Sequence, residues 1–317
     1  MKVLVTPTSL QPGKNEAALK PLREFADELV FNESGKPLSE EDLIPKLQGC
    51  DGYIAGLDQI TQKVLVSCPD LKVVSRYGAG YDRVDINAAR DLNIKVTNTP
   101  GVNAQAVGEL TFGLILSVAR KIPYLNHETR DGHWIRSTGM ELKGKTLGIL
   151  GLGAIGRVVA QCAQGFGMKV IAYDPFMNEA YCKEHQIKSV SFEELMRCSN
   201  VVSLHLPLTN DTHHLIDAAS IDLLPDGAIL VNASRGGIID EDAAYAALKK
   251  GKLAGLGLDA FEVEPPTASP LFELDNVIVT PHTGAHTKEA TDNMAHASIQ
   301  NLIDVLSGKE CPYIVNN

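Results

Sequence analysis

The sequence predicts an α/β protein with two doubly wound parallel-sheet domains. Short runs of Val, Ile and Leu without polar alternation recur along the chain, and such runs are typical of parallel strands covered by helices on both faces. Helical patterns or turn signals separate the runs, which gives the strand–helix rhythm of a doubly wound fold. With 317 residues, 44% of them hydrophobic, the chain is long enough for two domains with separate cores.

The predicted strands form two series with a domain boundary near Thr99 and Pro100, where a proline and a glycine interrupt the pattern. The first series comprises residues 3–5, 53–55, 72–74 and 95–97. The second comprises residues 146–150, 169–173, 201–204, 228–231, 255–258 and 277–280. A helix over residues 291–306 is expected to return to the first domain. We therefore predict a discontinuous domain of residues 1–99 and 287–317, with a second domain of residues 100–286 inserted in it.

The composition excludes several classes of protein. A formal net charge of -10 opposes general binding to nucleic acids. The cysteines form no CxxC pair, so neither a metal site nor a disulfide framework is expected. They are Cys50, Cys68, Cys162, Cys182, Cys198 and Cys311. Since no apolar run has the length of a membrane span or the form of a signal peptide, we expect a cytoplasmic protein without a membrane partner.

A glycine-rich motif follows the first strand of the second series. Gly151, Gly153 and Gly156 form a GxGxxG pattern between strand 146–150 and a helical stretch, and Asp174 closes the next strand. This context predicts dinucleotide binding, with the pyrophosphate at the helix N-terminus. Asp174 would bind the ribose hydroxyls and repel a 2′-phosphate, which favours NAD. The alternative is an ordinary turn in which Asp174 only caps the following segment.

Three titratable or charged residues each stand just beyond a predicted strand: Arg235, Glu264 and His282. Ligands of open parallel sheets bind outside the carboxyl ends of the strands, so these side chains are expected to point to one crevice. Reduction of a 2-oxo acid needs a fixed cation, a proton donor and a group that keeps the donor protonated. Arg, His and Glu supply these roles. Taken singly, the alternatives are two solvated loop residues and a packing histidine.

Several motifs in the same order resemble those of D-isomer-specific 2-hydroxyacid dehydrogenases, most of all the short D-3-phosphoglycerate dehydrogenase-type members. They lie at residues 76–82, 98–101, 151–156, 205–209, 232–237, 258–265 and 281–285. The resemblance implies a Rossmann NAD-binding domain inserted in a flavodoxin-like substrate-binding domain. It also implies that Arg235 orients the substrate, His282 transfers the proton and Glu264 hydrogen-bonds His282.

The resemblance further implies two sets of binding residues. The cofactor set is Gly151, Gly153, Ile155, Gly156, Asp174, His205, Pro207, Thr212, Ala233, Asp259 and His282. The substrate set is Arg76, Gly78, Ala79, Gly80 and Arg235. In the cofactor set, Ile155 offers a backbone amide to the pyrophosphate, while Ala233 and Asp259 hold the nicotinamide carboxamide.

The substrate is left open by the sequence. Arg76 is expected either to bind a second anionic group, which favours 3-phosphoglycerate, or to steer anions as an exposed residue. Arg83 stands where the family usually has a neutral amide. Glyoxylate, hydroxypyruvate and sulfolactate-type acids remain alternatives, and so does a non-catalytic NAD-sensing protein. By resemblance, a formate dehydrogenase would have a neutral amide in place of Glu264, and a phosphite dehydrogenase would have a lysine within residues 76–81. The sequence has neither feature, so neither activity is expected.

The long helical pattern over residues 103–121 is apolar on more than one face, which favours a homodimer formed through this helix. By resemblance, Arg136 would then approach the partner's active site. Trp134 is expected either at a subunit contact or in the core. Since the sequence ends at Asn317, the regulatory domain of longer phosphoglycerate dehydrogenases, and with it inhibition by serine, is expected to be absent.

Overall fold

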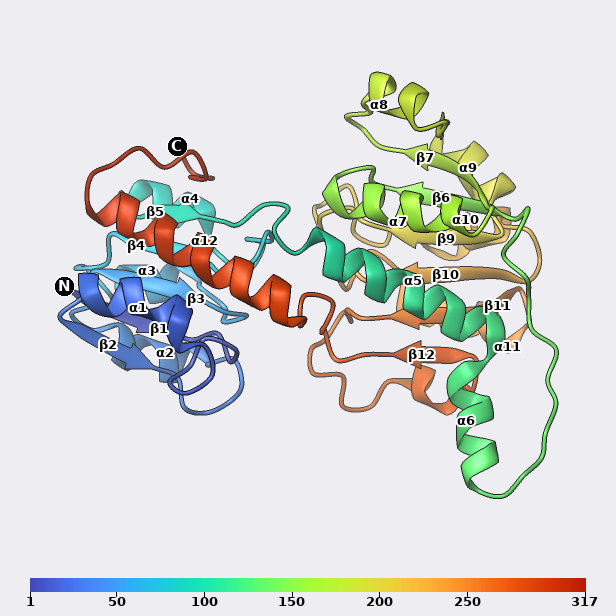
Figure 1. The fold of residues 1–317 in the computed structure, drawn as a ribbon, viewed down its shortest axis with the longest axis horizontal. Coiled ribbons are helices and arrows are strands. Elements are labelled where there is room, and N and C mark those ends of the chain that lie inside the picture. Colours follow the sequence, from blue (N-terminus) through green and yellow to red (C-terminus); the bar gives the residue numbers. More distant parts are fainter. The chain divides into compact units, whose positions relative to one another are not determined.

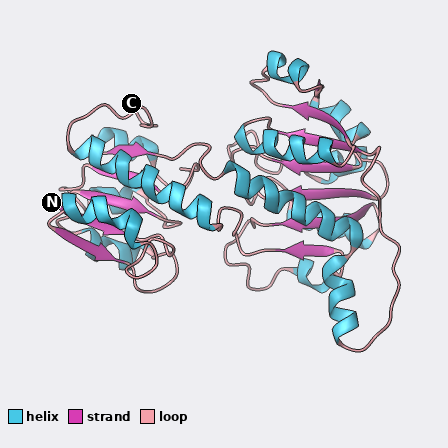
Figure 2. Ribbon diagram, viewed as in Figure 1, coloured by secondary structure: helices cyan, strands magenta, loops and turns pink.

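The computed structural model describes residues 1–317, and the chain divides into two compact units. The first unit comprises Met1–Asn103 and His286–Asn317, and the second comprises Ala104–Ala285. Each unit contains one sheet in which every strand pair is parallel (Figure 2). The predicted fold class, two doubly wound parallel-sheet domains, is therefore confirmed.

The sheet of the first unit has the strand order β2-β1-β3-β4-β5. Its strands are β1 (Lys2–Val5), β2 (Glu28–Phe31), β3 (Gly52–Ala55), β4 (Val73–Arg76) and β5 (Lys95–Thr97). Its helices are α1 (Glu16–Phe25), α2 (Glu40–Leu47), α3 (Gln62–Val66), α4 (Ile86–Asp91) and α12 (Lys288–Leu306). The winding direction reverses between β1 and β3, and doubly wound proteins bind ligands beside such a switch point.

Helices cover both faces of this sheet. On one face, α1 and α12 lie side by side (Figure 1), and their residues Leu19 and Ile299 join Val3 and Val5 of β1 in one core. On the other face, α2, α3 and α4 pack on a second core that includes Leu4. Since successive strand residues point to opposite faces, an uninterrupted apolar strand serves both cores.

The sheet of the second unit has the order β12-β11-β10-β9-β6-β7-β8, with its switch point between β6 and β9. Its strands are β6 (Thr146–Leu150), β7 (Lys169–Tyr173), β8 (Lys188–Ser189), β9 (Val201–Leu204), β10 (Ala228–Asn232), β11 (Leu253–Leu258) and β12 (Val277–Val279). Its helices are α5 (Ala104–Arg120), α6 (Ile122–Arg130), α7 (Ala154–Gly165), α8 (Glu179–Glu184), α9 (Phe192–Cys198), α10 (Ala218–Leu223), α11 (Glu241–Lys249) and the short 3₁₀ helix η1 (Pro270–Glu273).

Two cores again flank the sheet. The core beneath α5 and α7 contains Ile115 and Val159, and the two helices cross the same face of the sheet in Figure 1. The core beneath α9, α10 and α11 contains Leu195 and Leu248. Because the strands are parallel, the loops after β6, β9, β10, β11 and β12 all lie at the carboxyl ends of the strands. The predicted site residues of this unit lie there.

Two observed strands, β2 and β8, have no counterpart among the predicted strands. Both lie at a sheet edge. No residue of β2 is fully buried and β8 has only two residues, so neither carries the apolar run of a central strand. α12 begins before the predicted start at residue 291, because the side chain of Thr287 caps it by accepting a hydrogen bond from the Ala290 amide.

α5 corresponds to the helix predicted over residues 103–121, but ten of its residues are buried within this single chain. It therefore has less free apolar surface than the sequence suggests. Trp134 is 83% exposed, so the expectation that it packs in the core is wrong. No helix of the structure combines the length and the apolar character that a membrane span requires.

Candidate functional site

Three glycines shape the turn between β6 and α7, each for a different reason. Gly151 has a φ of +95°, and a Cβ there would lie 2.6 Å from the carbonyl oxygen of His205. A Cβ on Gly156 would lie 2.2 Å from the carbonyl oxygen of Gly151, so α7 packs closely on the turn. A Cβ on Gly153 would meet no atom within 4 Å. A tight turn, close helix packing and an open approach are what a pyrophosphate-binding turn requires.

The first turn of α7 presents backbone amides to this open space. Gly153 is the N-cap residue of α7 and provides no side-chain hydrogen bond to those amides. The first amides of an α-helix have no intrahelical acceptor, and the helix dipole adds partial positive charge. Ile155, whose amide was predicted to meet the pyrophosphate, lies in this turn. The residues present therefore fit a bound pyrophosphate.

Asp174 follows β7, the neighbour of β6 in the sheet. One carboxylate oxygen accepts a hydrogen bond from the Leu152 amide at 2.8 Å, and the other accepts one from the Phe176 amide at 2.8 Å. The carboxylate is thus fixed beside the glycine turn. Each oxygen has a further lone pair for a ribose hydroxyl.

His205 follows β9, on the other side of the switch point. Its Nε2 lies 2.8 Å from the hydroxyl of Ser203, while its Nδ1 is buried without a partner. Burial lowers the pKa of His205 to about 3, so the imidazole stays neutral at physiological pH. A buried ring nitrogen that lacks a partner within the chain fits a site that a bound cofactor completes.

The loop after His205 is closed by Thr212. Its hydroxyl donates to the carbonyl oxygen of Pro207 at 2.6 Å and accepts from the Thr209 amide at 2.8 Å. Thr212 therefore shapes the loop that carries Pro207. The cofactor contacts predicted for these two residues stay predictions.

The structure brings Glu264 and His282 together. Arg235, Glu264 and His282 follow β10, β11 and β12, which are neighbours in the sheet. Nδ1 of His282 lies 2.8 Å from Oε1 of Glu264, and the two side chains are 26% and 16% exposed. With Nδ1 held by the carboxylate, Nε2 is the ring nitrogen left for a substrate.

The backbone of His282 is held in an unusual conformation by a buried carboxylate. His282 has a φ of +50°, in the left-handed region that non-glycine residues seldom adopt. Asp259, only 2% exposed, accepts hydrogen bonds from the Thr280 hydroxyl at 2.5 Å and from the amides of Thr283 and Gly284, each at 2.8 Å. The sequence reasoning missed this contact. Strained residues that are fixed in this way concentrate at functional sites.

The turn that carries Arg235 packs directly on the loop that carries Glu264. A Cβ on Gly236 would lie 1.8 Å from the carbonyl oxygen of Phe261. The Asn232 side chain, at the end of β10, donates to the carbonyl oxygen of Arg235 at 2.7 Å, with Ala233 between them in the turn. An Arg235 Nη1 donates to the carbonyl oxygen of Ser234 at 2.7 Å. The turn is therefore fixed against the Glu264–His282 pair.

The predicted substrate residues of the first unit lie at the carboxyl end of β4. Arg76 is only 4% exposed, so its proposed role as an exposed, anion-steering residue is wrong. Its guanidinium donates to main-chain carbonyl oxygens instead, among them those of Ala55 and Gly80, both at 3.1 Å. Gly78, Ala79 and Gly80 form the loop that follows it.

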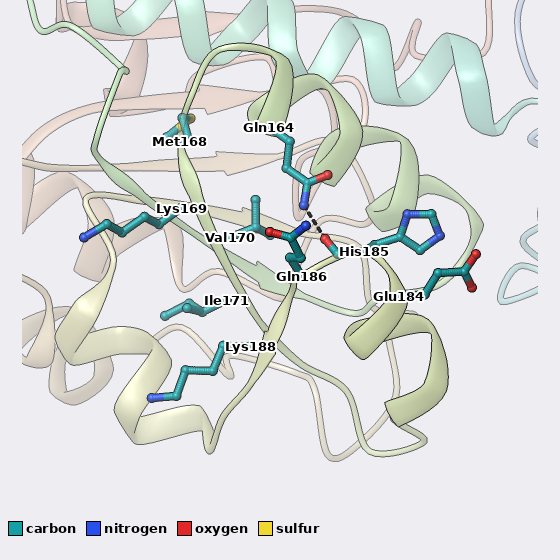
Figure 3. Close-up of a pocket in the computed structure, with 9 residues that line it drawn as sticks. All are labelled: Gln164, Met168, Lys169, Val170, Ile171, Glu184, His185, Gln186 and Lys188. Atoms are coloured by element: carbon teal, nitrogen blue, oxygen red, sulfur yellow. Dashed lines mark hydrogen bonds between the residues drawn. The ribbon is translucent and has the colours of Figure 1, made fainter.

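A separate hollow lies at the edge of the seven-stranded sheet, around β7 and β8 (Figure 3). Its lining residues are Gln164, Met168, Lys169, Val170, Ile171, Glu184, His185, Gln186 and Lys188. None of the predicted site residues is among them, so this hollow is not part of the predicted site.

Known proteins resemble the chain over most of its length. Residues 112–284 match the family model of the D-isomer specific 2-hydroxyacid dehydrogenase, NAD binding domain. A glyoxylate reductase of Thermococcus litoralis is 41% identical over 284 residues, which are 86% of each chain. A D-3-phosphoglycerate dehydrogenase of Methanocaldococcus jannaschii is 39% identical over an alignment of 320 positions, which covers all of this chain but 59% of that protein.

A solved structure is also similar to this chain over nearly its whole length. The D-lactate dehydrogenase from Aquifex aeolicus, complexed with NAD and lactic acid, superposes with a TM-score of 0.86 at 28% identity, over 99% of both chains.

Proposed function

Because the chain belongs to the D-isomer-specific 2-hydroxyacid dehydrogenase family and is an NAD-dependent oxidoreductase, we propose that it reduces a small 2-oxo acid of the glyoxylate or hydroxypyruvate type. The observation that carries the catalytic part is the Glu264–His282 pair, 2.8 Å apart, beside the Arg235 turn. We assign catalysis to these three residues and cofactor binding to the second unit. The first unit, through the amides of residues 78–80, is assigned to the substrate carboxylate.

NADH, held at the glycine turn between β6 and α7, would supply a hydride for C2 of the oxo acid. Arg235 holds the carboxylate and the carbonyl oxygen, so that negative charge developing on this oxygen is stabilised. Nε2 of His282 donates a proton to the same oxygen, which becomes the hydroxyl group. Glu264 accepts from Nδ1, orients the ring and stabilises the imidazolium. In the direction of oxidation, His282 takes the proton from the hydroxyl.

The other cofactor contacts follow the same assignment. We propose that Gly151, Gly153, Ile155 and Gly156 bind the pyrophosphate. We propose that His205, Pro207, Thr212, Ala233, Asp259 and His282 surround the nicotinamide half. The unpartnered Nδ1 of His205 supports this placement.

Replacing Ser203, the hydrogen-bond partner of His205, with Ala should weaken NADH binding, and unchanged binding would argue against a cofactor contact at His205.

Steady-state rates with NADH and a panel of acids test the proposed reaction. The panel comprises glyoxylate, hydroxypyruvate, pyruvate, sulfopyruvate and 3-phosphohydroxypyruvate. We expect the highest kcat/KM with glyoxylate or hydroxypyruvate. The second candidate is 3-phosphohydroxypyruvate, which the similarity to a D-3-phosphoglycerate dehydrogenase favours. Tight NADH binding without turnover of any acid would instead indicate an NAD-sensing protein.

Asp174 should set the preference for NAD over NADP. Its carboxylate is fixed by two amides and would repel a 2′-phosphate. In Asp174→Ser, we expect the ratio of kcat/KM with NADH to that with NADPH to fall by about tenfold or more, since a charge repulsion of about 1.4 kcal/mol or more is removed. Equal turnover of NADH and NADPH by the unaltered enzyme would contradict this role.

We propose a homodimer, now supported by the segment around α6 rather than by α5. α6 has no buried residue and projects from its sheet (Figure 1). Ile122, Trp134 and Ile135 are 51%, 83% and 43% exposed, and apolar side chains that gather in one exposed segment are typical of an association surface. Arg136 lies in the same segment, where a partner's site could be reached. Sedimentation as a monomer at micromolar concentration would refute the dimer.

We further propose a cytoplasmic location, with no nucleic-acid or membrane partner. All six cysteines are free, and four of them are buried as thiols. The acidic net charge of -10 opposes binding to nucleic acids and anionic lipids. Cell fractionation that recovered the protein with membranes would contradict this location.

A further inference from the structure

The loop after β4 has its carbonyl oxygens bound from within the first unit. The carbonyl oxygen of Gly78 accepts from the Thr99 amide at 3.0 Å, and that of Ala79 accepts from Nδ2 of Asn98 at 2.7 Å. The carbonyl oxygen of Gly80 accepts from Nε of Arg76 at 3.1 Å. The carbonyl groups of three successive residues are therefore hydrogen-bonded within the first unit.

This arrangement dictates where the amides of the loop point. In a trans peptide, the C=O of one residue and the N–H of the next point in opposite directions. Anchoring the carbonyl groups of residues 78, 79 and 80 therefore directs the amides of Ala79, Gly80 and Tyr81 away from their anchors. Gly78 has a φ of +140°, which permits this path because glycine lacks a Cβ. Successive backbone amides form an anion-binding concavity where they converge.

The side chain of Arg76 connects this loop to the end of the neighbouring strand. Besides Gly80, its guanidinium binds the carbonyl oxygens of Ala55 and Gly56, at the end of the neighbouring strand β3. The side chain is almost completely buried. Arginine can make several such bonds because its donors form a rigid planar fork, which lysine lacks. By binding three carbonyl groups, the guanidinium links the loop after β3 to the loop after β4.

The backbone of Asn98 is also hydrogen-bonded within the first unit. Its amide donates to the carbonyl oxygen of Tyr313, and its own carbonyl oxygen accepts from the Asn301 side chain at 2.9 Å. The side-chain Nδ2 of Asn98 therefore reaches the carbonyl oxygen of Ala79 from an anchored backbone. It carries no charge, so it provides a test of the loop that does not alter the electrostatics.

We propose that Arg76 and Asn98 are positioning residues that direct the amides of residues 79–81 toward the substrate carboxylate, and that Arg76 does not bind a second anionic group of the substrate. This inference rests on the function proposed above. Every acid of the panel shares the C1 carboxylate, and binding of this group would then depend on Arg76. Selectivity for a phosphorylated acid would then need other residues.

The test compares Arg76→Met and Asn98→Ala with the unaltered enzyme. KM is measured for glyoxylate and for 3-phosphohydroxypyruvate, or the inhibition constant of the latter if it is not turned over. For both variants we expect these constants to rise by about tenfold or more for both acids, since misdirected amides weaken binding of the shared carboxylate. kcat should change less, because the carboxylate is bound in ground state and transition state alike. The NADH dissociation constant should stay unchanged, because the cofactor is assigned to the second unit, and circular dichroism and the unfolding temperature show whether the variants fold.

Arg90→Met is the matched control, because Arg90 is an exposed arginine of the same unit that contacts the Asn87 side chain. A rise confined to the phosphorylated acid in Arg76→Met would overturn the proposal and make Arg76 an anion ligand. Unchanged constants in Asn98→Ala would overturn it as well.

If the unaltered enzyme reduced none of the acids, the proposed function would fail, but the loop could still be tested by hydrogen exchange. The Thr99 amide, which donates to Gly78, should exchange faster in both variants. Unchanged exchange would show that neither side chain fixes the loop.

Discussion

Replacing His282 with Asn should lower kcat by about 10²- to 10⁴-fold, the usual contribution of a positioned general acid or base. Asn is the informative substitution because His282 has a φ of +50°, and Asn tolerates the left-handed region better than most residues. The hydrogen bonds from Thr283 and Gly284 to Asp259 should therefore persist and keep the turn in place. NADH binding, followed by stopped flow, should weaken much less than kcat falls, because His282 is only one of the residues assigned to the nicotinamide half and binding does not require proton transfer.

His214→Asn is the matched control for this substitution. His214 also has a φ of +50°, and its Nε2 lies 2.9 Å from a carboxylate oxygen of Glu262, only two residues before Glu264 in the chain. The two histidines thus have the same backbone conformation, and each contacts a glutamate, Glu262 for His214 and Glu264 for His282. Only His282 is assigned to proton transfer. If both variants lost turnover equally, the loss would reflect the loop structure, and His282 would not be the proton donor.

The pH profile provides a second readout of the same assignment. The proposed proton-transfer group must carry a proton for reduction and lack it for oxidation, so kcat for reduction should fall at high pH and kcat for oxidation should fall at low pH. His205 cannot produce either limb, because burial lowers its pKa to about 3. The residual activity of His282→Asn should therefore lack this limb, and a profile that retained it would assign the titration to another group.

The sequence was sufficient for the fold class and for the central strands because their signals are local. Uninterrupted apolar runs predict buried parallel strands, and the spacing of Gly151, Gly153 and Gly156 carries its own steric explanation. The edge strands β2 and β8 escaped because edge positions need not be apolar.

The contacts that support the site could not be predicted in the same way. The hydrogen bonds of Asp259 to the His282 turn join residues 21 to 25 positions apart, and their geometry depends on how two neighbouring strands end. The clearest error concerns one of the two alternatives for Arg76, the exposed and anion-steering residue, because the side chain is only 4% exposed. In the structure it binds backbone carbonyl groups, and nothing local in the sequence distinguishes these cases.

Gly236→Ala should lower kcat/KM by about 10²-fold or more, although no functional group is removed, because a displacement of about 1 Å in a catalytic group can cost that much. A Cβ at this position would lie 1.8 Å from the carbonyl oxygen and 2.0 Å from the carbonyl carbon of Phe261, and 2.6 Å from the amide nitrogen of Glu262. These neighbours are backbone atoms, so no side-chain rotation relieves the contact. Either the turn with Arg235 or the loop with Glu264 must move.

The matched control is Gly165→Ala, near the end of α7, where an added Cβ meets no atom within 4 Å. It should keep its activity and gain helix propensity. For Gly236→Ala, circular dichroism and NADH binding separate local displacement from unfolding. The seven-stranded sheet and the glycine turn should remain intact, because the clash is confined to the two loops that follow β10 and β11. A folded Gly236→Ala enzyme with normal kcat/KM would show that the backbone contact between these loops does not set the positions of Arg235 and Glu264.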